Sequence, residues 1–212
     1  IGSQYPLGKS RRNINKPNKE VNKTIRSVVK SMMTQQVEIK YFDQFSAGSI
    51  PVAGTLTNIS DVTKGTDVTQ RIGNQVTLKH LHVALTANIH PSAVNAYIRM
   101  LVVKDKMGTN APIMADILDA GYLASPFCSI APTYWDYRKR FQILYDQKAL
   151  LTQQAFTACA LTADLELNFE SQHIGASTTF KNQLYLIILS TEQNVLTLPG
   201  HYWQSRLTFT DE

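Results

Sequence analysis

Long hydrophobic runs are missing from this sequence, and their absence excludes a membrane-spanning helix. The longest uninterrupted apolar stretch covers residues 184–189, whereas a helix needs about 20 such residues to cross a bilayer. No apolar segment follows the basic N-terminal residues, so no secretory signal is visible and we expect no membrane partner. Because the chain starts at Ile1 rather than Met, we expect it to be processed or to lack upstream residues.

Cysteine and charge are both scarce. Cys128 and Cys159 show neither a CxxC motif nor metal-ligand spacing, so two thiols in a reducing compartment are the simplest interpretation. Charged residues make up only 17% of the chain and hydrophobic residues 43%, which excludes a disordered or coiled-coil protein. A chain of 212 residues is long enough to bury a substantial core.

The common enzyme motifs are also absent. The sequence has no G-x-S-x-G elbow, no phosphate-binding G-x-x-x-x-G-K-[ST] loop, no G-x-G-x-x-G and no H-E-x-x-H. His80 and His82 share one face of a predicted strand and could chelate a metal. Alternation puts any such pair on one face, however, so ordinary half-buried histidines are the simpler interpretation. We expect a protein that is not an enzyme.

Positive charge is concentrated at the N-terminus. The chain has a net charge of +5, but residues 1–30 alone carry +7 and the remaining residues −2. Such asymmetry is typical of tails that bind polyanions. The candidate nucleic-acid-binding residues are Lys9, Arg11, Arg12, Lys16, Lys19, Lys23, Arg26 and Lys30.

The basic region divides into two parts. Residues 1–17 contain few apolar groups and several Gly and Pro residues, which predicts a flexible arm. Residues 18–35 have apolar side chains at helical spacing, with Asn18 as a plausible N-cap, and their basic residues gather on the opposite face. This pattern predicts an amphipathic helix. Its apolar stripe, suited to packing against another subunit, is Val21, Ile25, Val28 and Met32.

The rest of the chain, residues 36–212, has the pattern of strands. Period-two alternation and turn residues predict an all-β fold with eight strands, a bulge near His80 and one short helix at about 113–119. Eight short strands with long loops favour a jelly-roll β-sandwich. The predicted strands are 37–46, 54–59, 76–90, 96–104, 138–146, 157–169, 180–190 and 201–210.

A second basic cluster, Arg138, Lys139 and Arg140, follows the aromatic residues at 134–137. Basic residues interleaved with aromatic ones can hold single-stranded nucleic acid by charge and stacking. The alternative is an edge-strand charge cluster, which discourages aggregation between sheets. The sequence leaves both interpretations open.

Several segments resemble one known family. In order along the chain they are V37-E-I-K-Y-F42, T69-Q-R-I-G-N-Q-V76, K79-H-L-H-V83, V103-K-D-K-M-G-T109, K139-R-F-Q-I-L-Y-D146 and L207-T-F-T-D-E212. From about Val29 onward this colinear series is similar to coat proteins of the satellite tobacco necrosis virus type. It also resembles the related capsid proteins of small circular single-stranded DNA viruses.

The resemblance implies a jelly roll with strand orders BIDG and CHEF. It also implies a T=1 icosahedral shell of sixty copies, with the N-terminal helix on its inner face near threefold axes. The expected partners are further copies of this chain, a single-stranded RNA or DNA genome and a host receptor. The expected location is the virion, assembled in the cytoplasm or nucleus of the host cell.

The resemblance further implies that calcium binds between subunits, with no other cofactor. Glu38 and Asp211 match acidic ligand positions of the plant satellite coats, and Gln75 is retained. Ile72 stands where the family has a serine ligand, so only its backbone carbonyl could serve there. The alternative to a coat protein is a non-viral β-sandwich with a basic tail that binds nucleic acid or carbohydrate. An enzyme on a jelly-roll scaffold, such as a cupin, is a third interpretation.

Overall fold

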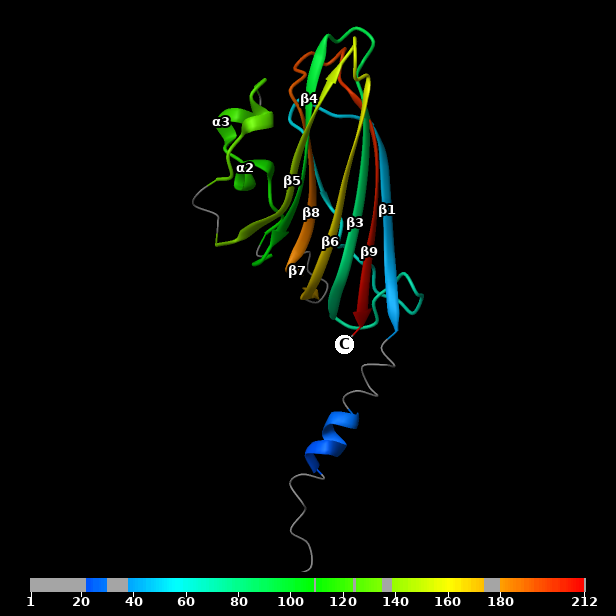
Figure 1. Cartoon of the computed structure of the whole chain (residues 1–212). Coiled ribbons are helices and arrows are strands. Elements are labelled where there is room, and N and C mark those ends of the chain that lie inside the picture. Colours follow the sequence, from blue (N-terminus) through cyan, green and yellow to red (C-terminus); the bar gives the residue numbers. More distant parts are fainter. Residues whose placement is uncertain are drawn as a thin grey trace, which may run out of the picture. The chain divides into compact units, whose positions relative to one another are not determined.

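A computed structural model gives the structure of the chain (Figure 1). It describes residues 22–29, 38–108, 110–123, 125–134, 139–173 and 180–211. Residues 1–37 and 38–212 form two separate units, and each is treated by itself below. Among the described residues, no helix is both long enough and apolar enough to cross a membrane.

Residues 38–212 form a sandwich of two antiparallel sheets (Figure 1). One sheet has the order β1-β9-β3-β6-β7, and its strands are β1 (Ile39–Ser49), β9 (Gly200–Asp211), β3 (Gln75–Asn88), β6 (Ala158–His173) and β7 (Phe180–Lys181). The other has the order β2-β8-β4-β5, and its strands are β2 (Thr55–Asn58), β8 (Gln183–Ser190), β4 (Asn95–Asp105) and β5 (Phe141–Thr152).

This topology confirms the predicted jelly roll. When the eight long strands are lettered B to I in chain order, the sheets read BIDG and CHEF, and the two-residue β7 extends the first sheet beside β6. The predicted bulge is also present, because the register of β3 shifts between Leu78 and His80 against both of its neighbours. The bulge lets Leu78 and Leu81 both face the core, although they are an odd number of residues apart.

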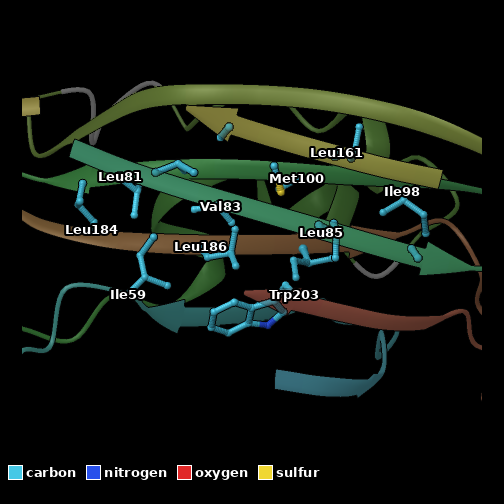
Figure 2. Packing of buried hydrophobic residues seen from close by; sticks show 14 of the residues in the cluster. Ile59, Leu81, Val83, Leu85, Ile98, Met100, Leu161, Leu184, Leu186 and Trp203 are labelled. Atoms are coloured by element: carbon cyan, nitrogen blue, oxygen red, sulfur yellow. The ribbon is translucent and has the colours of Figure 1, made fainter. Parts of the chain in front are cut away.

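The main core lies between the two sheets (Figure 2). Strand β3 contributes alternate side chains to it, as its period-two pattern predicts, while all eight residues of β8 are buried. A strand buried on both faces reads as a continuous apolar run rather than as an alternating one. The labelled core residues in Figure 2 are Ile59, Leu81, Val83, Leu85, Ile98, Met100, Leu161, Leu184, Leu186 and Trp203.

A second apolar cluster explains why β8 is buried on its outer face too. The connection between β4 and β5 folds over this face of the sheet, where Ile117, Leu118 and Cys128 pack against Ile187 and Leu189. The connection forms α2 (Met114–Ile117), α3 (Ala120–Leu123) and the 3-10 turn η1 (Cys128–Ile130), rather than the single helix expected at 113–119. Two short helices and one turn therefore replace the one helix that the sequence predicted.

Both cysteines are free thiols. Burial raises the pKa of Cys128 and also that of Cys159, so both are protonated at neutral pH. The Cys128 thiol donates to the Ser190 carbonyl at 3.0 Å, which fastens the β4–β5 connection to the end of β8. These thiols have a packing role in the subunit.

Candidate assembly and nucleic-acid surfaces

The basic helix is described over residues 22–29, and every one of these residues is exposed. Lys23 and Arg26 are three residues apart and therefore share a face. Ile25 and Val28 share another, with 53% and 47% of their surface exposed. The helix thus presents cations on one side and exposed apolar side chains on another. The other candidates, Lys9, Arg11, Arg12, Lys16, Lys19, Val21, Lys30, Met32 and Arg138, lie outside the described residues.

The connections at one end of the sandwich form a second surface of interest, the apical end (upper end in Figure 1). It consists of loops 50–54, 89–94, 153–157 and 191–199. Glu192 carries the single formal charge in these four loops. The large hydrophobic side chains that they expose are Val94, Phe156, Val195 and Leu196. Exposed apolar side chains on the loops at one end of a sandwich are a candidate surface for protein–protein contact.

The apical loops are held to one another by hydrogen bonds. Gln153 donates through Nε2 to the His90 carbonyl at 2.7 Å and through its backbone N–H to the Val94 carbonyl at 3.2 Å. The backbone N–H of Ile50 donates to the Pro199 carbonyl at 2.9 Å. These hydrogen bonds hold the loops that carry the apolar side chains in defined positions.

The opposite, basal end of the sandwich brings the predicted calcium-site residues into one region. Asp211 lies at the end of β9, and the Lys40 ammonium contacts its Oδ2 at 2.7 Å. The backbone N–H of Ile72 donates to the other oxygen, Oδ1, at 3.2 Å. Glu38 is exposed just before β1, and Gln75 is half-buried at the start of β3.

This donor set does not fit a calcium ion. Calcium takes six to eight oxygen ligands, whereas the Asp211 carboxylate already has the Lys40 ammonium 2.7 Å from Oδ2, and Ile72 turns a backbone N–H rather than a carbonyl toward Oδ1. Among the described residues, no cluster of three His, Cys, Asp or Glu side chains could hold a metal. A bound cation would also lie against the Lys40 ammonium, which is 2% exposed.

Arg140 has a structural role. It makes a bidentate ion pair with Asp105, in which the Nη2–Oδ2 distance is 2.7 Å and the Nε–Oδ1 distance is 3.1 Å. It also donates a hydrogen bond to the Asn110 carbonyl. Asp105 is fully buried, and its hydrogen bonds raise the pKa of the Arg140 guanidinium. The neighbouring Lys139 is exposed. Of this basic cluster, Lys139 therefore stays a predicted nucleic-acid contact, whereas Arg140 neutralises the buried Asp105 carboxylate.

His80 and His82 share a single carboxylate. The Nε2 of His80 lies 2.6 Å from Oδ1 of Asp164, and the Nδ1 of His82 lies 3.8 Å from the same atom. All three side chains are well exposed on the outer face of the β1-β9-β3-β6 sheet. The two histidines are partly exposed and lie beside one acidic residue, Asp164, on the same strand surface.

A buried histidine that the sequence did not single out predicts a pH dependence. His173 is 2% exposed, and its burial, together with the nearby charge of Arg71, lowers its pKa to about 4. In the unfolded chain His173 binds a proton as the pH falls through about 6.5, whereas in the folded chain it stays neutral until the pH approaches 4. Stability should therefore be constant above pH 6.5 and fall below it, by about 3 kcal/mol at pH 4.

Urea unfolding of the dissociated subunit at pH 7, 6, 5 and 4 measures this effect. Carboxylates add their own pH dependence, so the comparison is with His173→Leu, which should lose the part of the slope due to the histidine. Equal slopes for the two proteins would show that His173 is protonated as readily in the folded chain as in the unfolded one.

Sequence reasoning missed the buried charges. Arg99 donates to Asp146 through Nε and Nη2 at 2.8 and 2.7 Å and to the Ala131 carbonyl at 2.7 Å, and it is 4% exposed. The available signal was strand phase, because Arg99 lies on the same face of β4 as the buried residues Leu101 and Val103. A charge on a buried phase needs a partner, and the sequence does not identify that partner.

Comparison with known proteins gives one family match. A family model described as the satellite tobacco necrosis virus coat protein matches residues 10–196. Among solved structures, a chain of Desmodium yellow mottle tymovirus matches with 13% sequence identity and a TM-score of 0.40, covering 82% of this chain and 88% of that one. A search of curated protein sequences found no match. Since the family model spans most of its length, the chain belongs to the satellite tobacco necrosis virus coat protein family and is a viral coat protein of the virion, not an enzyme.

Proposed function

We propose that this coat protein assembles into a closed T=1 shell of sixty copies and packages a single-stranded genome through its basic arm and helix. The observation that carries the proposal is the separation of charge within one chain. The N-terminal segment has a net charge of +7 and its described helix exposes Lys23 and Arg26, while the apical loops of the jelly roll carry one formal charge and expose several large hydrophobic side chains.

The apical end suits contact between identical subunits. Around a rotation axis the same loops meet in every copy, so any formal charge there would face its own copies. With Glu192 as the one formal charge in the four loops, this repulsion is small. Exposed Val195 and Leu196 add apolar area that a neighbouring subunit can bury.

Genome packaging follows from charge neutralisation. Sixty copies carrying +7 each bring on the order of 400 positive charges to the interior. A basic helix face contacts phosphates rather than base edges, so it binds single-stranded RNA or DNA with little regard to sequence and loses affinity steeply with salt. The apolar stripe, including Ile25 and Val28, packs against the helices of neighbouring copies and leaves the cations facing the nucleic acid.

Charge reversal of the helix tests packaging. The triple variant K23E/R26E/K30E should reduce nuclease-protected nucleic acid per shell by roughly fivefold or more, because these side chains would then repel phosphate. The measurements are the 260/280 nm absorbance ratio of purified particles and the length of the protected nucleic acid.

The matched control is K64E/K79E/K148E. It makes the same change in net charge at three exposed positions of the sandwich, outside the N-terminal segment. It should package as the unmodified chain does. Undiminished packaging by the helix variant would show that the helix face is not the binding surface.

A further inference from the structure

The basal end of the sandwich contains an ammonium group at the position where the family resemblance places a metal. The Nζ of Lys40 lies 2.7 Å from Oδ2 of Asp211, and Lys40 is 2% exposed. A charge this well buried is stable only with an opposite charge and further hydrogen bonds. Both are present, because the same Nζ donates to the Gln70 carbonyl at 3.1 Å.

Together, Lys40 and Asp211 join three segments of the chain. Lys40 belongs to β1, Asp211 ends β9, and Gln70 and Ile72 belong to the loop between β2 and β3. Two hydrogen bonds attach the loop to this ion pair. The Gln70 carbonyl accepts from the ammonium, and the Ile72 N–H donates to the carboxylate at 3.2 Å. Oxygen atoms from a carboxylate and a backbone carbonyl converging on one cation are also what a calcium ion requires.

We propose that the Lys40 ammonium replaces a divalent cation at this junction, so that β9 is held to β1 and to the β2–β3 loop without calcium. The ammonium supplies the positive charge from within the subunit, and it cannot be removed by a chelator. Calcium binding at Asp211 would require two cations to share one carboxylate, which is unfavourable at this degree of burial.

The unmodified chain provides the first test. Thermal disruption of purified particles and thermal unfolding of the dissociated subunit are each followed in 5 mM EDTA and in 5 mM calcium chloride at the same ionic strength, because the resemblance places calcium between subunits. For each sample the two Tm values should agree within about 1 °C, since Asp211 already has its counter-ion. A calcium-induced rise of several degrees that Asp211→Asn abolishes would overturn the proposal.

Substitution provides the second test, with a control on the same two strands. Arg206 of β9 and Asp43 of β1 also form an ion pair at 2.7 Å, but their side chains are 62% and 42% exposed. Lys40→Met should lower the Tm by about 10 °C, because it leaves a carboxylate in a largely buried site without its counter-ion. Arg206→Met should lower it by less than about 2 °C.

Equal, small shifts for the two variants would overturn the proposal, because a replaceable Lys40 cannot be the cation that holds the junction. If Lys40→Met does not fold, the comparison of EDTA with calcium on the unmodified chain still decides. The substitution test reads Tm from the dissociated subunit, so a failure of shell assembly would not affect it.

Discussion

Replacing Val195 and Leu196 by aspartate should abolish shell formation and leave a folded subunit. Both side chains are highly exposed, at 70% and 80%, so the substitution removes almost no packing from the subunit itself. In the proposed shell, each copy would instead bring two carboxylates to an axis where identical loops meet. Lost apolar burial and like-charge repulsion together weaken each contact by several kcal/mol.

Sedimentation velocity and circular dichroism separate assembly from folding in this variant. The aspartate variant should sediment as single subunits with an unchanged β-sheet spectrum. The isosteric control V195T/L196N adds polarity without charge and should assemble with reduced yield. Normal particles from the aspartate variant would show that the apical loops do not form a subunit contact.

Arg140→Met should cost about 3–5 kcal/mol of unfolding free energy. Asp105 is fully buried, and besides Arg140 it accepts the backbone N–H groups of Met107 and Gly108 at 3.1 Å. Removal of the guanidinium leaves a carboxylate with no cation to offset its desolvation. The φ of Gly108 is +56°, so the turn that Asp105 organises has a backbone conformation that favours glycine.

Lys139→Met is the matched control, because it removes the same charge from the adjacent, exposed position. Urea unfolding should show a change of less than about 0.5 kcal/mol for this variant. If Lys139 contacts the genome, the same variant also lowers the amount of packaged nucleic acid. Equal stability of the two variants would contradict the structural role of Arg140.

The strands were predictable because hydrophobic alternation is a local signal, whereas the order of the strands in the two sheets was an expectation from the family resemblance. In β3 the apolar phase changes at the bulge near His80, and the continuous apolar run of β8 marks a strand buried on both faces. A second bulge was not predictable. Val102 pairs with Tyr145 and Val103 with Ile143, so Leu144 is the extra residue and the period-two alternation of β5 is interrupted there.

The buried charges at the basal end show the limit of sequence reasoning more clearly. Asp211 was identified as a cation ligand through family resemblance, while the cation itself, Lys40, went unnoticed. Lys40 shares the inward phase of β1 with Phe42, which signals a buried charge. Its partner lies at the other end of the chain, and only the pairing of β1 with β9 brings the two together.

The mass of the particle tests the central claim most directly. Sixty copies of a 23.7 kDa chain give a protein mass of about 1.4 MDa, with packaged nucleic acid in addition. Mass photometry of the purified chain at low salt should show one population above that value, which nuclease treatment of opened shells reduces to it. A single population at the mass of one or a few subunits would contradict the account, as would a closed shell of a different copy number.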